Sequence, residues 1–206
     1  DLDYSNKSSR ILMAFAYWNV IEYFFPYKYV MDQKWDITLN ETLPLMVQAK
    51  NSDEFYKEFR KMTTKLNDSH VDFAMYNNSI FGNKIKSFPA DAKIIDDKLV
   101  VTEILGDSLA QVDNIKVGDV ITKVNGKTIK EHIEANRDLL AASNEPKYLD
   151  KLVRRILISY SENVDVEFLK DGKYITKSMI WMGHHESHRN EYKKGAQKKK
   201  DKFKLL

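Results

Sequence analysis

The chain has 206 residues, 43% of them hydrophobic, which is enough to bury one or two ordinary cores. Residues 193–206 hold seven Lys and one Asp, a local charge of +6, so the net charge of +3 leaves −3 for the remainder. A mildly acidic body argues against a nucleic-acid-binding surface there. The absence of Cys excludes disulfides and thiolate metal sites and leaves the compartment open.

The N-terminal end carries no recognisable targeting segment. It opens with Asp1-Leu2-Asp3, without the basic and then apolar run of a signal peptide. The apolar run 11–25 is too short to cross a bilayer and contains Asn19 and Glu22, so a buried helix is predicted for it. The abrupt start and end of the sequence predict a fragment of a longer protein.

Three helices are predicted before about residue 80. Ser8 or Ser9 is expected to cap the first, which runs toward Pro26. Its apolar positions recur at helical spacing: Ile11, Phe15, Trp18, Ile21 and Phe25. The second is predicted over about 38–50, with Pro44 leaving open a start near Leu43. Asn51-Ser52-Asp53 is expected to cap a third helix, whose apolar face is Phe55, Phe59, Met62 and Leu66. Residues 71–75 alternate like a strand.

From about residue 88 the apolar period changes from helical to two. Strands are predicted at 90–95, 98–105, 119–124, 164–169 and 174–181, with turns at Asp96-Asp97 and at 170–172. Short helical segments separate them: 108–112, a helix capped by Thr128 that carries Ile129, Ile133, Leu139 and Leu140, and another after Pro146. Residues 183–206 are polar and Lys-rich and are predicted to be a linker.

The most specific local signal is the stretch 116–127. Gly118 suits a tight turn, and Asp119 can hydrogen-bond back into it. The strand that follows is expected to place Val120, Thr122 and Val124 on one face, and Asn125-Gly126 suits two successive residues at positive φ. This phrase resembles the glycine–aspartate to valine–asparagine–glycine core of bacterial PDZ domains, and the order of elements resembles a circularly permuted PDZ domain. An α+β fold is therefore expected: a helical domain at 1–85, a PDZ-like domain at 86–182 and a linker from 183.

Asp68-Ser69-His70 is the second signal and is weak on its own. By itself it indicates the end of a helix followed by a histidine whose hydrogen bonds are satisfied within a loop or the core. Combined with residues 18–26, Trp35-Asp36 and the PDZ-like phrase, it resembles the front half of the C-terminal processing (tail-specific) serine peptidases, tricorn-core-like branch.

That resemblance implies His70 as the general base toward a serine nucleophile and Ser69 as an auxiliary group that helps orient a catalytic Glu or water. A neutral imidazole titrates near working pH and can accept a proton from a hydroxyl. Other members of the family use a Ser-Lys pair, which stays an alternative. The family carries its nucleophile in a later α/β domain that this sequence does not include, so the isolated chain is expected to be inactive.

The resemblance also implies a peptide-binding groove. Its carboxylate loop would be 88–90, its strand 90–95 and its helix the one after Thr128. The residues concerned are Phe88, Pro89, Ala90, Ala92, Ile94, Ile129, His132, Ile133 and Asn136. Pro89 has no N–H to offer a carboxylate. The alternative for Phe88, Ile129 and Ile133 is that they only fill the core.

No cofactor and no metal site is predicted, because His184 and His188 lack a surrounding helix signal. The expected partners are a peptide or protein substrate, above all a C-terminal tail, and the missing catalytic domain. An exported location, periplasm or cell envelope, follows from the resemblance alone. Two other interpretations stay open: a stand-alone peptide-binding adaptor, and a scaffold whose helical part docks to a partner.

Overall fold

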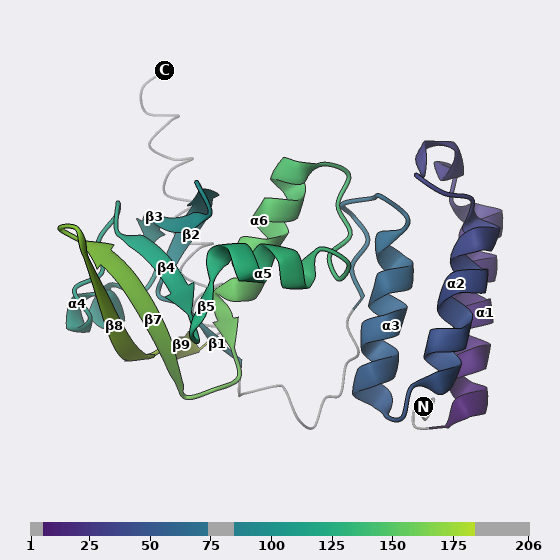
Figure 1. Ribbon diagram of the computed structural model, residues 1–206, viewed down its shortest axis with the longest axis horizontal. Coiled ribbons are helices and arrows are strands. Elements are labelled where there is room, and N and C mark those ends of the chain that lie inside the picture. Colours follow the sequence, from purple (N-terminus) through teal and green to yellow (C-terminus); the bar gives the residue numbers. More distant parts are fainter. Residues whose placement is uncertain (1–5, 74–84, 184–206) are drawn as a thin grey trace, which may run out of the picture. The chain divides into compact units, whose positions relative to one another are not determined.

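The computed structural model describes residues 6–73 and 85–183 (Figure 1). The chain forms two compact units. The helical unit comprises residues 1–75 and 135–148, and the sheet unit comprises 76–134 and 149–206. The α+β class predicted from the sequence is confirmed. The division into domains at residues 85 and 182 stays a prediction.

The helical unit is built on α1 (Lys7–Phe24), α2 (Trp35–Gln48) and α3 (Ser52–Thr64), with the short 3-10 helix η1 (Lys28–Val30) between the first two. The three long helices run side by side, and α2 packs against both α1 and α3 (Figure 1). The predicted apolar face of α3 is confirmed, since each member is at most 1% exposed: Phe55, Phe59, Met62 and Leu66. Asn51 caps α3 by accepting from the N–H of Glu54 at 2.9 Å.

The first two helices differ from expectation at their starts. The cap of α1 is Asn6, whose side chain accepts from the N–H of Ser8 at 2.8 Å, so both predicted cap serines lie inside the helix. Helix α2 begins at Trp35, and Pro44 is accommodated inside it. Pro44 lies on the exposed side, where water can satisfy the carbonyl that the missing N–H leaves. The predicted strand is absent over 71–73, and its last two residues lie outside the described part.

The sheet unit holds an antiparallel sheet in the order β2-β3-β4-β7-β8, with β5 paired to β4. The bounds are β2 (Ala90–Ile95), β3 (Lys98–Ile104), β4 (Val120–Val124), β5 (Lys127–Thr128), β7 (Asn163–Lys170) and β8 (Lys173–Ile180). A second sheet has the order β6-β1-β9, from β1 (Lys86–Ser87), β6 (Ile158–Ser159) and β9 (Met182–Gly183). A cross-strand row of Leu99, Ile121 and Phe168, each at most 1% exposed, fixes the register of the larger sheet.

The turns of this unit lie where the sequence predicts them. Gly118, Asn125 and Gly126 have φ of 91°, 50° and 74°, and Asp119 accepts from the N–H of Lys116 at 3.0 Å. The strand between them departs from simple alternation. A register shift between Ile121 and Lys123 makes both Ile121 and Val124 buried, so the expected face of Val120, Thr122 and Val124 is not formed.

Three helices connect these strands: α4 (Asp107–Val112), α5 (Ile129–Asn136) and α6 (Glu145–Ile156). Thr128 caps α5 as predicted, accepting from the N–H of Glu131 while the Glu131 carboxylate accepts from the N–H of Thr128 at 2.7 Å. The helix ends at Asn136, before the leucines expected on its face. Both α5 and α6 cross the boundary between the units, because residues 135–148 group with the N-terminal helices. None of the helices in the described ranges combines the length and the apolar character that a membrane crossing needs.

Candidate functional site

The turn after α3 brings a carboxylate to the candidate histidine. Asp68 Oδ1 accepts from the backbone N–H of His70 at 2.8 Å and lies 2.9 Å from Nδ1 of its ring. An ionised carboxylate only accepts, so Nδ1 is the donor to Asp68, and in the neutral ring Nε2 is the nitrogen with the lone pair. The His70 side chain is 97% exposed. The ring thus faces the outside with Nε2, and the general-base role of His70 stays a prediction.

Ser69 lies beside this pair, and its hydroxyl is already hydrogen-bonded. Its Oγ is 2.6 Å from Oγ of Ser143 and accepts from the backbone N–H of Ser143 at 2.9 Å. Ser143 belongs to the connector between α5 and α6, which is part of the helical unit. The hydroxyl therefore holds the turn against this connector, and the auxiliary role that the resemblance implies for Ser69 stays a prediction.

A buried arginine supports the same turn. Arg60, 8% exposed, donates from Nε to the carbonyl of Leu139 at 2.9 Å, from one terminal nitrogen to Tyr56 Oη at 2.8 Å, and from the other to Asp72 Oδ1 at 3.2 Å. Asn67 donates to Asp32 Oδ2 at 2.6 Å. The residues before and after Asp68-Ser69-His70 are thus both held by polar side chains of the helical unit.

Sequence reasoning singled out His70 and Ser69 as candidates but not the residues that contact them, and their roles stay predictions. The Asp-x-His spacing was the available signal for Asp68, since an Asp side chain readily bonds two residues ahead. No local pattern pointed to Arg60 or Ser143. Arg60 reaches Leu139 across 79 residues of chain, and Ser143 lies 74 residues from Ser69, so only the tertiary structure brings these groups together.

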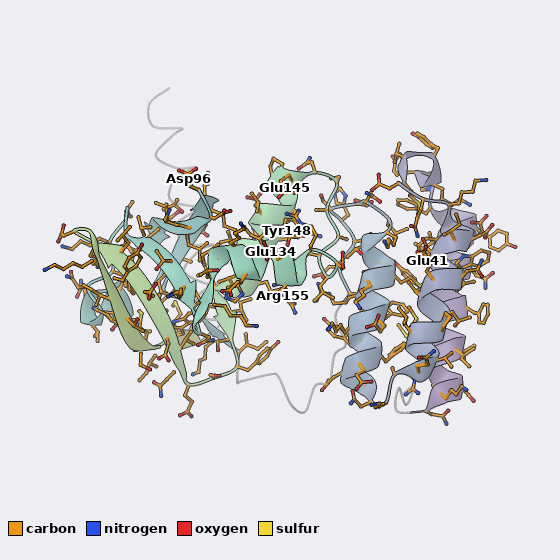
Figure 2. All side chains as sticks on the ribbon, in the orientation of Figure 1. Glu41, Asp96, Glu134, Glu145, Tyr148 and Arg155 are labelled. Carbon is orange, nitrogen blue, oxygen red and sulfur yellow. The ribbon has the colours of Figure 1, made fainter. Side chains whose placement is uncertain are left out.

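A recess of about 440 Å³ opens beside the turn, within the helical unit. Its lining includes Asn67, Lys65, Ser143 and the pair Arg137–Glu145. Arg137 donates to both carboxylate oxygens of Glu145, at 2.6 and 3.0 Å, and its guanidinium lies 4.0 Å from the centre of the Tyr148 ring. Figure 2 labels Glu145 and Tyr148, which both come from the first turns of α6. The hydrogen bonds from Arg137 lower the pKa of Glu145 and raise that of Arg137 itself.

The sheet unit offers a different kind of site at strand β2. Among the described residues, β2 pairs with β3 alone. The hairpin closes through Asp96 and Asp97, at φ of 48° and 54°, and Figure 2 labels Asp96 at this turn. In such a two-residue hairpin the pairs alternate, so Ile94 points its N–H away from β3.

Ala92 has the same orientation. Its partner Val101 turns its own N–H and C=O to Asp119 and Gly118 on the far side, so this pair exchanges no hydrogen bond. The N–H of Ala92 is instead accepted by the Asp91 carboxylate at 2.8 Å. The outer edge of β2 therefore carries backbone groups spaced for an added strand, and one of them, the N–H of Ala92, is bonded to the exposed Asp91 side chain.

The predicted carboxylate loop uses its polar groups internally. Phe88 is 1% exposed, donates its N–H to Leu157 at 3.0 Å and packs edge-on to Trp181 with ring centres 5.5 Å apart. Pro89 offers no N–H, and its carbonyl accepts from Leu105 and Gly106. Residues 88 and 89 thus present no unused N–H to a peptide carboxylate.

The other groove candidates fall into buried and half-buried groups. Ala90, Ala92 and Ile129 are at most 4% exposed and face the interior, whereas Ile94, His132, Ile133 and Asn136 are half-buried. His132 Nε2 lies 3.2 Å from the carbonyl of Val124. Asn136 belongs to the residues that group with the helical unit. The assignment of these side chains to peptide contact stays a prediction.

The described residues contain no candidate metal site. No three His, Asp or Glu side chains there come close enough together to hold an ion. His184 and His188, weighed in the sequence as a metal pair, lie outside the described residues, as does the Lys-rich segment after them.

Comparison with known proteins identifies one family model. The PDZ domain model matches residues 70–146, which confirms the PDZ domain predicted from the phrase at 118–126. A search of curated proteins finds no match. Among solved structures, a photosystem II D1 C-terminal processing protease is similar at 17% identity and a TM-score of 0.46, over 84% of this chain and 44% of that chain. The chain thus spans less than half the length of that protein.

Proposed function

Starting from the PDZ match over 70–146, we propose that this chain binds extended peptide along the outer edge of β2 and presents it to a serine-type peptidase active site. The observation that carries the proposal is the outer edge of β2, which pairs with no strand in the described ranges 6–73 and 85–183 and where Ala92 and Ile94 direct their N–H groups away from β3. An extended peptide can add there as a further antiparallel strand, the mode by which PDZ domains bind their ligands.

Backbone pairing, rather than capture of a terminal carboxylate, supplies the affinity in this proposal. The N–H of Phe88 is occupied and Pro89 has none. A C-terminal tail, the substrate implied by the family resemblance, would then be held through its extended backbone. Specificity would come from side chains that alternate along the peptide.

The direct test is a titration of a hydrophobic octapeptide into the chain, followed by the backbone amide resonances of Ala92 and Ile94. Both should shift and saturate together, and the same peptide with an amidated C-terminus should bind with a similar Kd. Unmoved resonances at these two amides would rule out the edge as the binding site. A large loss of affinity on amidation would restore the carboxylate-capture mechanism.

The peptidase part of the proposal rests on the Asp68–His70 pair. With Nδ1 hydrogen-bonded to Asp68, Nε2 can take the proton of a serine hydroxyl as that oxygen attacks a peptide carbonyl, and can return it to the leaving amine. The nucleophile would come from a domain outside the 206 residues, so the isolated chain should cleave no peptide. An exported location belongs to the same proposal.

This part is tested in the product of the complete gene. His70→Ala should abolish peptide hydrolysis while leaving peptide binding at β2 unchanged, and Asp68→Asn should reduce turnover and alter its pH profile, because Asn can present its NH₂ to Nδ1 and favour the other tautomer. Full activity of His70→Ala would remove His70 from the mechanism. The stand-alone adaptor would then be the better interpretation, since it needs β2 but no catalytic histidine.

A further inference from the structure

The two faces of β2 differ in exposure and in charge. Ala90 and Ala92 are at most 4% exposed and face the interior of the sheet unit. The alternate residues Asp91, Lys93 and Ile95 are exposed on the opposite face. Lys93 is the only cationic residue of β2, and it lies midway along the edge where a peptide strand can add.

The strands beside Lys93 provide no counter-charge for it. Its partner on β3 is Val100, and the same cross-strand row continues through Val120 on β4 to Leu169 on β7. These three side chains are apolar and half-buried. Within residues 6–73 and 85–183, no hydrogen bond or ion pair engages the Lys93 ammonium. This exposed cation is therefore available to a carboxylate on an added strand.

An added antiparallel strand places one of its residues directly opposite Lys93. Ala92 and Ile94 direct their N–H groups outward, so each can exchange hydrogen bonds with one peptide residue. The peptide residue between those two lies opposite Lys93 in a non-hydrogen-bonded pair, in which side chains approach most closely. Because opposite residues share a face of the sheet, its side chain points to the exposed face beside Lys93.

The other charges on this face lie farther from that position. Asp91 lies two residues before Lys93, its carboxylate accepts a backbone N–H at 2.8 Å, and its partner on β3 is Glu103. Lys98 lies at the hairpin end of β3. Side chains directly opposite each other are about 4.5–5.5 Å apart at Cβ, whereas diagonal neighbours such as Asp91 are about 7–8 Å away. Lys93 therefore has the strongest electrostatic effect on the peptide residue that faces it.

We propose that β2 selects peptides that carry an Asp or Glu opposite Lys93, whose ammonium pairs with that carboxylate. This inference rests on the proposed function, strand addition at β2. It adds the class of peptide, namely an extended segment with an acidic side chain on the exposed face. Lys93 acts in recognition and takes no part in peptide cleavage.

Three octapeptides that differ at one position test the charge preference. Each is built from Thr and Val, with blocked termini and with Glu, Gln or Lys at the fourth position, so that this side chain carries the only charge. A slip of two residues keeps every side chain on its face, so the charged residue can settle opposite Lys93. Titrations followed at the amides of Ala92 and Ile94 give the Kd. The Glu peptide should bind about two- to fivefold more tightly than the Gln peptide, and the Lys peptide more weakly by a similar factor.

Charge reversal in the protein identifies the residue responsible. In Lys93→Glu the order should invert, with the Lys peptide bound most tightly, and in Lys93→Ala the three Kd values should become nearly equal. The matched control is Lys173→Glu, because Lys173 is an exposed residue of β8, at the far end of the sheet order from β2. It changes the net charge equally and should leave the order unchanged. The Lys-rich residues 193–206 attract any acidic peptide, but they are identical in all variants and cannot cause an inversion.

The outcomes separate this inference from the proposed function. Equal Kd values for the three peptides, with both amides shifting, would overturn the charge preference and leave strand addition intact. A preference for Glu that persists in Lys93→Glu and in Lys93→Ala would assign it to another cation and overturn the role of Lys93. Amides that none of the peptides shifts would overturn strand addition itself. An unchanged unfolding midpoint verifies that each variant is folded.

Discussion

The two units of this chain are specified by their sequences in different ways. In the sheet unit, turns such as Asn125-Gly126 and Asp171-Gly172 fix where each strand ends, and buried cross-strand rows fix the register. In the helical unit, the turn at Asp68-Ser69-His70 is held by side chains of other segments, namely Arg60, Asp32 and Ser143. The β2 edge of the first unit is thus set locally, whereas the His70 turn of the second depends on the tertiary contacts around it.

The largest effects should come from the two cores. Phe59→Ala in the helical unit and Phe168→Ala in the sheet unit each remove a side chain at most 1% exposed, and each should lower the free energy of unfolding by about 3–5 kcal/mol. Denaturant unfolding is followed by Trp18 and Trp35 for one unit and Trp181 for the other. If the units unfold independently, each substitution should shift only its own reporter.

The matched control for these changes is Phe24→Ala. Phe24 is 80% exposed, so its loss should change stability by no more than about 0.5 kcal/mol in the isolated chain. A single transition in which all three tryptophans move together for either core variant would show that the two units unfold as one.

Arg60→Leu should have the next largest effect. It leaves the Leu139 carbonyl and Tyr56 hydroxyl without their donor, at a cost of about 2–4 kcal/mol, and it loosens the turn that holds His70. Hydrogen exchange at residues 67–72 should speed up while β2 is unaffected. Lys61→Ala, which removes only a surface pair with Glu58, is the control and should change neither quantity. Protection of the turn that survives Arg60→Leu would contradict the support we assign to this side chain.

Alkaline pH should distinguish the units as well. Burial raises the pKa of Tyr17 to about 12 and also raises that of Tyr148, both in the helical unit. Because the pKa is raised in the folded state, the contribution of the buried, protonated tyrosine to the stability of the fold is fully present below pH 10. It is lost as pH rises from 10 toward 12. The helical unit, followed by Trp18 and Trp35, should therefore lose stability before the sheet unit does as pH rises above 10. Tyr17→Phe should remove much of this loss of stability. A Tyr17→Phe protein with an unchanged alkaline midpoint would exclude this tyrosine as the cause.

Acidic pH should not distinguish the stabilities of the two units in the same way. Hydrogen bonds from Thr128 and Thr122 lower the pKa of Glu131 and Glu167 in the sheet unit, and Arg137 does so for Glu145 in the helical unit. Because the pKa of each of these carboxyl groups is lowered in the folded state, the ionised group contributes stability above about pH 4.3. That contribution is lost on further acidification. Both units should weaken together there.

The smallest effect concerns the edge of β2. The Asp91 carboxylate accepts from the N–H of Ala92, and an incoming peptide must displace it. Asp91→Ala should therefore tighten peptide binding by about two- to tenfold, the equivalent of one surface hydrogen bond of roughly 0.5–1.5 kcal/mol. Isothermal titration with one peptide measures this, with Asp97→Ala in the turn as the control. Weaker binding to the Asp91 variant would mean that this carboxylate contacts the peptide instead.

The sequence by itself determined the features that depend on neighbouring residues. The face of α3, the two-residue turns, the capping box at Thr128 and the PDZ phrase were all predictable, because each follows from backbone preferences or from a period along a few residues. It also pointed to His70 and Ser69 through their combination with other motifs.

Only the tertiary structure decided what surrounds those residues. The bulge after Ile121 depends on pairing with β7, the start of α2 at Trp35 depends on packing against α1, and the burial of Phe88 depends on Trp181. One contact that holds the His70 turn, between Ser69 and Ser143, joins residues 74 positions apart, and residues 135–148 group with the distant N-terminal helices. Such contacts leave no periodic trace in a single sequence, because their free energy comes from side chains that meet only after folding.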